Sequence, residues 1–134
     1  MEFNIRQLEP TDYDTLLVKW WDAWGFKPPP RDFLPDGGTG GLLISNNETP
    51  VCAGFIYMTN SKISWINWII SNKEYKNKNR NSAIKTLLKQ LIDTAINSDA
   101  YYVFASNNNK FLINKFTDLG FVKGSKSTEL ILKI

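Results

Sequence analysis

The sequence contains no histidine and a single cysteine, Cys52. Without histidine, the chain cannot carry a Ser-His-Asp or Cys-His catalytic set, a histidine-ligated zinc or an imidazole pH switch. One cysteine forms no disulfide within the chain and no thiolate cluster for zinc or iron–sulfur. We therefore expect no metal site, since carboxylates alone would have to build it, and we expect Cys52 to be a small buried side chain on a strand.

Long apolar runs are also absent: no stretch approaches the roughly 20 residues that a membrane span needs. The first residues, Met1–Arg6, do not place an apolar region after a basic one as a signal peptide does. The sequence thus predicts a cytoplasmic protein without a membrane partner. No repeat, linker or low-complexity tract divides the 134 residues, so we expect residues 1–134 to form one domain.

Charge is distributed unevenly along the chain. Residues 1–36 carry seven acidic and four basic side chains, whereas residues 73–134 carry five acidic and eleven basic ones. The basic side chains are densest in residues 73–89, where Glu74 is the one acid. This basic segment predicts an anionic partner or, alternatively, a solvated helix entrance.

Alternating or continuously apolar runs bounded by turn residues predict strands at 3–8, 42–45, 51–59, 63–70, 101–105, 121–123 and 129–134. Short turns join the second, third and fourth of these into an antiparallel meander. In strand 63–70, the period of two puts Trp65, Asn67 and Ile69 on one face and Ser64, Ile66, Trp68 and Ile70 on the other. Both faces are largely apolar, which predicts a central strand.

Helical spacing of apolar residues predicts helices at 13–24, 83–96 and 108–119. Thr11 or Asp12 would cap the first helix. The second helix connects strand 63–70 to strand 101–105, and such a unit makes the two strands parallel. The predicted fold class is therefore α+β: a mixed sheet with an antiparallel N-terminal meander, a βαβ unit and a terminal strand pair.

The polar residues between strand 63–70 and a helix starting near Ser82 are the most informative ones for function. A helix N-terminus presents unpaired backbone amides at the positive end of its dipole. Lys76, Lys78 and Arg80 add formal positive charge, and asparagines, which tolerate left-handed backbone, alternate with them. The pattern predicts a pyrophosphate site. The alternative is an ordinary polar loop.

The same segment resembles the main motif of the GNAT family of N-acetyltransferases, often Tyr-Arg-Gly-x-Gly-x-Gly-x-Ala-Leu. Without gaps the motif falls on residues 75–84, with Lys76 in place of Arg or Gln, and Asn79 and Asn81 in place of glycines. The family's later motif, Asn-x-x-Ala-x-x-x-Tyr-x-x-x-Gly-Phe, matches Asn109 and the Gly-Phe pair at 120–121. Phe116 stands where that motif has its general acid, Tyr.

The order of elements is similar to that of the family over essentially the whole chain. Within the family, the sequence looks most similar to the small, divergent GNAT-like proteins of bacteriophages. The resemblance implies direct transfer of acetyl from acetyl-CoA to an amine of a small molecule or of a protein Lys or N-terminus. It implies a bulge in the fourth strand, near Trp68 to Ile70, where a backbone amide polarises the thioester carbonyl. The catalytic positions would then be Asn67, Trp68 and Ile69.

The resemblance also implies the residues that bind the two substrates. For acetyl-CoA they are Ile69, Ile70, Ser71, Lys76, Asn77, Lys78, Asn79, Arg80, Asn81, Ser82, Asn109 and Phe116. The acceptor pocket would be walled by Trp20, Trp24, Phe33 and Trp65, for which a place in the core is the alternative.

Phe116 has no proton to give to a departing thiolate, and the fourth strand offers no carboxylate as a base. The nearest acids, Asp22, Asp32 and Asp36, are expected at the surface. Three hypotheses follow. The first is an acetyltransferase that relies on positioning and an oxyanion amide. The second is a GNAT-fold module that binds CoA, a peptide or a host protein without turnover, and the third is a nucleic-acid binder that uses the basic segment. Either a monomer or a homodimer is compatible with the sequence.

Overall fold

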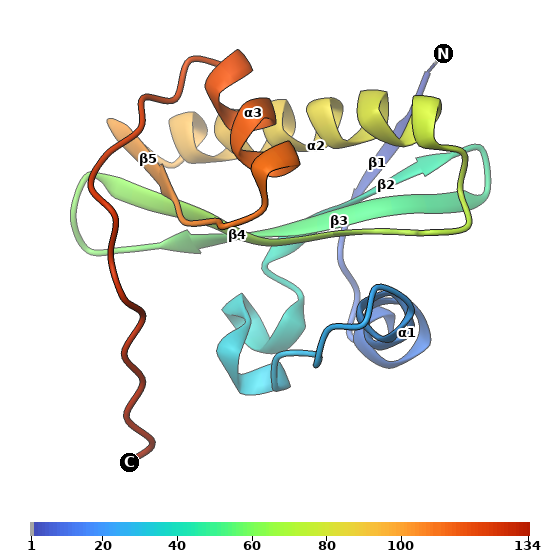
Figure 1. Cartoon of the computed structure of the whole chain (residues 1–134), viewed down its shortest axis with the longest axis horizontal. Coiled ribbons are helices and arrows are strands. Elements are labelled where there is room, and N and C mark those ends of the chain that lie inside the picture. The colour runs from blue at the N-terminus through green and yellow to red at the C-terminus, as the bar shows by residue number, and fades with distance from the viewer. Residues whose placement is uncertain (1) are drawn as a thin grey trace.

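The computed structural model describes residues 2–134, except the side chain of Asn77 (Figure 1). Its elements are β1 (Asn4–Gln7), the π-helical turn η1 (Tyr13–Leu17), α1 (Val18–Ala23), the 3-10 turns η2 (Arg31–Phe33) and η3 (Pro35–Gly38), β2 (Gly41–Asn46), β3 (Thr49–Met58), β4 (Ile63–Ser71), α2 (Asn77–Asn97), β5 (Tyr102–Ala105) and α3 (Lys110–Asp118). The five strands form one sheet in sequence order; β1 to β4 pair antiparallel, and β5 pairs parallel with β4. The α+β class, the meander and the βαβ unit are therefore confirmed.

The sheet separates two layers, with α2 and α3 on one face and α1 with the 3-10 turns on the other (Figure 1). Between the sheet and α2, Leu87, Leu88 and Leu91 of the helix are fully buried. Cys52 is buried in the same core, as expected, and burial raises the pKa of its thiol. On the other face, Trp21 and other side chains of α1 pack on buried strand residues. This second core fixes α1 beneath the strands.

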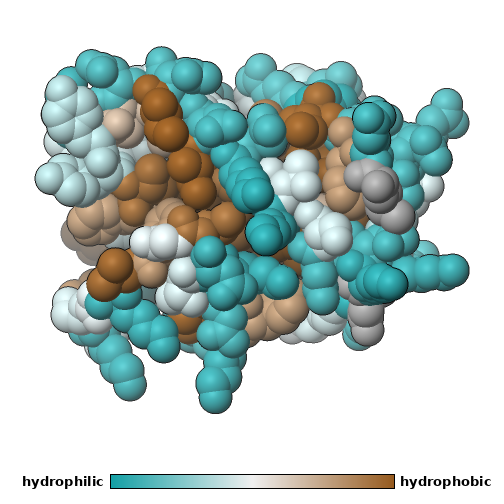
Figure 2. All heavy atoms as spheres, turned by 90° about the horizontal axis from the view of Figure 1, so that it is seen from above, coloured by the Kyte–Doolittle hydropathy of each residue, from teal (hydrophilic) through white to brown (hydrophobic). Residues whose placement is uncertain are grey.

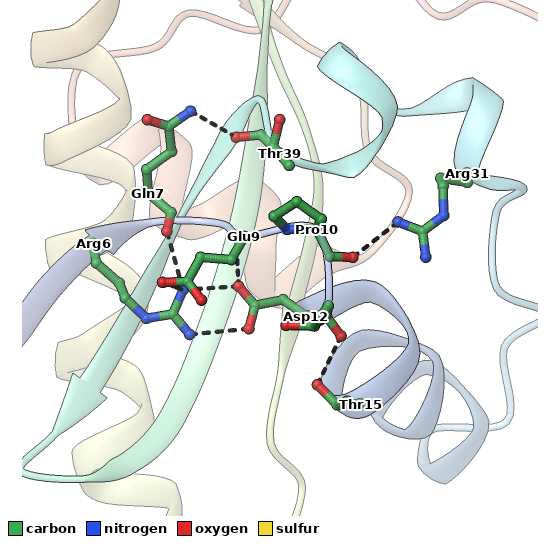
Figure 3. Close-up of polar contacts among 9 residues, drawn as sticks. Arg6, Gln7, Glu9, Pro10, Asp12, Thr15, Arg31 and Thr39 are labelled. Carbon is green, nitrogen blue, oxygen red and sulfur yellow. Dashed lines mark hydrogen bonds and ion pairs between the residues drawn. The ribbon is translucent and has the colours of Figure 1, made fainter.

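The junction between β1 and the first helix is held by polar contacts rather than by the predicted cap (Figure 3). Arg6 donates two hydrogen bonds to the carboxylate of Asp12, at 2.8 and 3.0 Å, and the backbone N–H of Glu9 donates a third at 2.6 Å. The hydrogen bonds from Arg6 hold the pKa of Asp12 below its ordinary value. The carboxylate of Asp12 is directed at Arg6 and Glu9 and makes no capping bond to the helix, so the expectation of such a cap was wrong for Asp12.

A β-bulge interrupts the regular alternation of β4. Ile69 packs with Ile66 in the core under α2, whereas Trp68 and Ile70 pack in the core on the α1 face. The predicted assignment of faces is therefore wrong beyond Asn67. The physical reason is that a bulge places two residues of one strand opposite one residue of its partner, which shifts the period-two pattern by one.

Helix α2 begins at Asn77, five residues before the predicted start near Ser82. Lys, Asn, Arg and Ser follow one another there without glycine or proline. Because none of these residues breaks a helix, the amphipathic helix extends one further turn into the polar stretch. Most of the expected pyrophosphate loop is therefore the first turn of a helix.

The predicted terminal strand pair does not form: among residues 2–134, no strand follows β5. The chain beyond α3 runs away from the sheet (Figure 1), so residues 121–123 and 129–134 have no partner strand. A strand needs such a partner to satisfy its backbone N–H and C=O groups. Within the described residues, no helix is long and apolar enough to cross a membrane.

Candidate functional site

Because β5 is short, the second half of β4 has an unpaired edge, and a cleft lies beside it. β4 pairs with β5 only over Ile63–Ile66, so the part of β4 from Asn67 to Ser71 has no partner in β5. A cleft of about 410 Å³ lies beside this part, between the N-terminal ends of α2 and α3. Its lining residues are Trp24, Phe26, Ile69, Ile70, Ser71, Arg80, Asn81, Ile84, Asn109, Phe111 and Leu112. Figure 2 shows the face of α2 and α3, where apolar side chains gather between hydrophilic ones.

The bulge of β4 lies beside this cleft. The pairing passes from Phe55 with Asn67 to Ala53 with Ile70, so one extra residue of β4 stands opposite Gly54. Trp68 takes the left-handed backbone conformation, with a φ of 57°. A bulge of this kind releases backbone groups from the ladder and re-aims them. The bulge expected near Trp68 to Ile70 is thus confirmed, whereas the catalytic role expected of Asn67, Trp68 and Ile69 stays a prediction.

Gly54 allows the bulge to pack against α2. A Cβ at this position would lie 2.5 Å from Cδ1 of Ile69 and 3.1 Å from Cδ1 of Leu91. Because real Cβ atoms are not found so close to another carbon, any side chain at residue 54 displaces Ile69, which lines the cleft. Only glycine lets β3, β4 and α2 approach as they do here.

A hydrogen-bonded trio ties the bulge to the loop that follows α1. The indole N–H of Trp68 donates to the hydroxyl of Tyr57 at 2.7 Å, and that hydroxyl donates to the backbone carbonyl of Phe33 at 2.6 Å. The rings of Phe33 and Trp68 lie 6.4 Å apart. Burial raises the pKa of Tyr57, and the bond from Trp68 partly opposes the rise. Local spacing carries no signal for Tyr57, because its contacts arise from a strand pairing and from a loop far from it in the chain.

Trp24 anchors the end of α1 to the turn before α2. Its indole N–H donates to the carbonyl of Ser71 at 2.8 Å. Lys73 Nζ and the Arg80 guanidinium carbon each lie 5.2 Å from the centroid of the Trp24 ring. Arg80 also donates to the carbonyl oxygens of Lys73 and Tyr75, at 2.9 and 2.7 Å. These contacts fix the turn and place two cations beside Trp24, which lines the cleft.

The N-terminus of α2 is basic. Lys76 is its N-cap residue and makes no side-chain capping bond, and the first turn contains no acid. Lys76, Lys78 and Ser82 are exposed and Asn79 is half-buried, while Arg80 and Asn81 line the cleft. The expected contribution of the Asn77 side chain lies outside the described residues.

Asn109 was expected at the site and lies in the cleft, where it also caps α3. Its Oδ1 accepts a hydrogen bond from the backbone N–H of Leu112 at 3.2 Å. Phe116 lies elsewhere: it is buried in the core under α2, with its ring 5.0 Å from that of Phe121. Phe116 is not among the residues that line the cleft.

The four aromatic residues expected at the acceptor side have different surroundings. Trp24 lines the cleft, and Phe33 is exposed next to the bulge. Trp20 is buried in the core under α1, and Trp65 packs on Phe104 with the ring centroids 5.1 Å apart. The structure thus brings two of the four to the region of the cleft and the bulge.

Four lining residues were not predicted: Phe26, Ile84, Phe111 and Leu112. Ile84 fits the apolar stripe of α2, so its spacing indicated core alone. Phe26 and Phe111 are exposed, and nothing in a linear sequence distinguishes an exposed aromatic residue at a cleft from one elsewhere on the surface.

In residues 2–134 no group of three or more metal-ligating side chains comes together.

No protein-family model matches the chain, and no curated protein matches it in sequence. Solved structures match it in fold. Glucosamine-6-phosphate N-acetyltransferase from Arabidopsis thaliana superposes with a TM-score of 0.69 at 13% identity, over 99% of this chain and 100% of that one. A transcriptional regulator from Bacillus halodurans C-125 superposes with a TM-score of 0.73 at 10% identity, over 98% and 100%.

N-acetylglutamate synthase from Neisseria gonorrhoeae, solved with coenzyme A and N-acetyl-glutamate, superposes with a TM-score of 0.71 at 16% identity. This match covers 93% of this chain and 29% of the longer synthase chain. TM-scores of this size establish a common fold, and identities of 10–16% leave the substrates open. The chain therefore has the GNAT fold, the fold of the N-acetyltransferases to which it is similar.

Proposed function

We propose that this protein is an N-acetyltransferase that binds acetyl-CoA in the cleft beside β4 and transfers the acetyl group to an amine. The observation that carries the proposal is the combination of a bulged β4, its unpaired edge beyond the end of β5 and the basic N-terminus of α2 at the end of the same cleft. Each of these features supplies one requirement of the reaction.

The first requirement is a place for the phosphates of the co-substrate. Unpaired amides and the positive dipole end of a helix stabilise an anion. α2 is 21 residues long and has no acid in its first turn, and Lys76 and Lys78 are exposed there. We assign the pyrophosphate to this turn, with Asn79, Arg80, Asn81 and Ser82 around it.

The second requirement is a place for the pantetheine arm and the thioester. A peptide-like chain can pair with an open strand edge, and β4 has such an edge from Asn67 to Ser71. Asn109, Phe111 and Leu112 of α3 provide the opposite wall. At the bulge, a backbone N–H of Trp68 or Ile69 would donate to the thioester oxygen and stabilise the charge that develops on it.

The third requirement is proton transfer, for which the site is poorly equipped. None of the residues that line the cleft is a carboxylate, and Phe116 is buried away from it. Asp22, Asp32 and Asp36 are exposed, as expected. The amine would therefore have to react as its neutral form with water as the base, which predicts slow transfer that accelerates with pH.

Thermal unfolding tests this proposal with acetyl-CoA, CoA and ADP as probes, each at low and moderate salt. At 100 times its Kd a ligand adds about 2.7 kcal/mol of stability, which raises Tm by several degrees in a domain of this size. We expect a larger rise with acetyl-CoA and CoA than with ADP. If none of the three ligands raises Tm, the proposal is contradicted.

A matched pair of variants locates the site. The double variant Lys76→Ser, Lys78→Ser removes two charges from the start of α2, and the control Lys123→Ser, Lys126→Ser removes two from the exposed C-terminal segment. We expect the rise in Tm to shrink in the first variant alone. If the rise in Tm shrinks equally in both variants, net charge is what matters and the helix N-terminus is not the phosphate site.

The second candidate function is binding of CoA or a peptide without turnover, and the buried Phe116 is the observation that favours it. Release of free CoA from acetyl-CoA, measured with a thiol reagent over a panel of amines, separates the two functions. Thermal stabilisation without CoA release for any amine would support the binding module.

A further inference from the structure

One end of the sheet face beneath β3, β4 and β5 is not covered by a helix. In Figure 1, α1 and the 3-10 turns lie under one part of the sheet, and among the described residues no helix lies under the end with the β3–β4 turn. Tyr57, Trp65 and Phe104 form a cross-strand row at this end, because Trp65 is the register partner of both other residues. Partners of this kind point to the same face of a sheet. Tyr57 and Trp65 are half-buried, and Phe104 is exposed.

Trp68 and Phe33 extend this row to the bulge of β4. Trp68 donates to the hydroxyl of Tyr57 and packs in the core under α1, so the row lies on the α1 face. The ring of Phe33, which is exposed, lies 6.4 Å from the ring of Trp68. Exposed apolar side chains that are contiguous mark a ligand or partner site, whereas single ones are ordinary. We call these five residues the aromatic surface: Phe33, Tyr57, Trp65, Trp68 and Phe104.

Asn67 is the polar residue of β4 on the same face. It is the register partner of Phe55, which is buried in the core under α1, so both side chains point to the α1 side. Asn67 is half-buried, and within the described residues its side-chain amide makes no hydrogen bond. Its Oδ1 is therefore a free acceptor. Asn67 is also the first residue of β4 beyond the pairing with β5, directly before Trp68 of the bulge.

The charge near the aromatic surface favours a cation. Residues 1–36, which include α1 and the loop that follows it, carry seven acidic and four basic side chains. In that loop Asp32 and Asp36 are exposed, whereas Arg31 is paired with Asp14 at 2.9 Å. An aromatic face attracts an ammonium group, and carboxylates nearby repel a phosphate or a second carboxylate.

We propose that the aromatic surface binds the acceptor, and that the acceptor is a primary amine on an aromatic or apolar body without phosphate or carboxylate. This inference rests on the proposed N-acetyltransferase function and names its acceptor class. The amine donates a hydrogen bond to Oδ1 of Asn67, and its body packs on the rings of Trp65 and Trp68. The nitrogen then bonds to the acetyl carbon, the C–S bond breaks with its electron pair on sulfur, and a proton passes from nitrogen to water. Asn67 thus holds the nitrogen beside the backbone N–H that is assigned to the thioester oxygen.

The indole N–H signals of the five tryptophans test the location without turnover. Each signal is assigned in a ¹H–¹⁵N spectrum by replacing one tryptophan with phenylalanine, and 2-phenylethylamine is then titrated into the wild-type protein with CoA present. We expect the largest shifts for Trp65 and Trp68 and none for Trp20 and Trp21, which are buried under α1. A spectrum without shifts, or with shifts of the other tryptophans alone, would overturn the proposal.

Three amines test the acceptor class with acetyl-CoA and wild-type protein: 2-phenylethylamine, ethanolamine and 4-(2-aminoethyl)benzoate. Release of CoA gives kcat/KM for each amine. We expect 2-phenylethylamine to exceed ethanolamine at least tenfold, because ethanolamine has no apolar body. We expect the benzoate to fall at least tenfold below 2-phenylethylamine, because it adds a carboxylate to the same body. If either of the other two amines matches 2-phenylethylamine, the proposed acceptor class is wrong.

Variants on the two faces of the sheet test the named residues. Trp65→Ala should raise KM for 2-phenylethylamine at least fivefold and leave the Kd of acetyl-CoA unchanged. Tyr101→Ala is the control: Tyr101 is 71% exposed, and the alternation of β5 places it on the other face with Val103, which packs under α2. Asn67→Ala should lower kcat/KM at least tenfold, whereas Asn67→Asp keeps an acceptor oxygen and should retain the activity. Equal effects of Trp65→Ala and Tyr101→Ala, or an unchanged kcat/KM in Asn67→Ala, would overturn the proposal.

The two binding events are measured separately, so the two proposals can fail separately. Shifts of Trp65 and Trp68 with the amine, in a protein that acetyl-CoA does not stabilise against heat, would support the amine site and contradict the acetyltransferase function. Stabilisation by acetyl-CoA without any shift of Trp65 and Trp68 by the amine would leave that function standing and overturn the acceptor class.

Discussion

Replacement of Gly54 by alanine tests the link between the bulge and the cleft. The new Cβ would lie 2.5 Å from Cδ1 of Ile69, 3.1 Å from Cδ1 of Leu91 and 3.3 Å from Cδ2 of Leu87. The two leucines are fully buried under α2, whereas Ile69 lines the cleft, so Ile69 is the side chain that has room to move. Gly54→Ala is therefore expected to push Ile69 toward the cleft.

The cost of this change follows from the size of the overlap. Overpacking a core by one methyl group costs about 1–3 kcal/mol, and we expect the lower half of that range because Cδ1 is the end of a side chain. A folded chain of 134 residues loses roughly 3–5 °C in Tm per kcal/mol, so Tm should fall by roughly 3–10 °C. Urea unfolding followed by tryptophan fluorescence measures the free energy of unfolding, with Gly124→Ala as the control because a Cβ there meets nothing within 4 Å.

The same variant has a second readout at the site. If Ile69 enters the cleft, acetyl-CoA should bind less tightly to Gly54→Ala than to wild type at a temperature where both proteins are folded. If Gly54→Ala has the same free energy of unfolding and the same acetyl-CoA affinity as the control Gly124→Ala, the packing argument is refuted.

Three further substitutions test other parts of the account. Asp12→Asn removes the acceptor of the Arg6 hydrogen bonds and should cost about 1–3 kcal/mol at pH 7, measured by urea unfolding. Arg6 holds the pKa of Asp12 below its ordinary value. The stabilisation is therefore complete above the ordinary carboxyl pKa and is lost as pH falls through the lowered pKa. The free energies of unfolding of wild type and Asp12→Asn should thus converge in acid. Tyr57→Phe removes the bonds to Trp68 and to the loop after α1; it should cost about 1 kcal/mol and slow any acetyl transfer, measured as CoA release. Phe116→Tyr buries a hydroxyl in the core, so it should lower stability by about 1–3 kcal/mol without raising the rate of transfer.

Each of these expectations has an outcome that contradicts it. A constant difference between Asp12→Asn and wild type from pH 7 to pH 3 would show that the carboxylate charge is not what stabilises the junction; Asp118→Asn is the exposed control. Unchanged stability of Tyr57→Phe would mean that the loop is held by other contacts. Faster transfer by Phe116→Tyr would place residue 116 at the reacting group, against the position that its burial indicates.

The strong periodic patterns predicted most of the fold. The apolar stripe of α2 and the apolar runs of β2 to β5 depend on local spacing, and a predicted segment overlaps each of β1 to β5 and α1 to α3. The terminal strands were wrong because a strand exists only with a partner, and the spacing of Leu130 and Leu132 carries no information about where that partner lies. The faces of β4 were wrong because the extra residue of the bulge is defined by the register with β3, which the sequence of β4 does not contain.

The candidate site was also predicted only in part, because some of its residues follow local motif spacing and others do not. Arg80, Asn81 and Asn109 stand at motif spacings that survive the loss of the motif's glycines, and the fold brings them to one cleft. Phe116 has the spacing of the family's tyrosine but packs in the core, because an apolar ring gains more from burial than from a place in a cleft. Tyr57, Phe26 and Phe111 reach the site through tertiary contacts between distant segments, for which local spacing gives no signal.

The central claim is that the cleft beside the β4 bulge binds acetyl-CoA, and a ¹H–¹⁵N correlation spectrum recorded during a titration with acetyl-CoA tests it most directly. We predict that the largest shifts occur for the backbone amides of Trp68, Ile69 and Ser71 and for those of the first turn of α2, while the amides of β1 stay in place. A spectrum that does not change, or one in which the shifts lie on the exposed part of α2 around Lys85 and Lys89 and leave β4 unaffected, would contradict the claim.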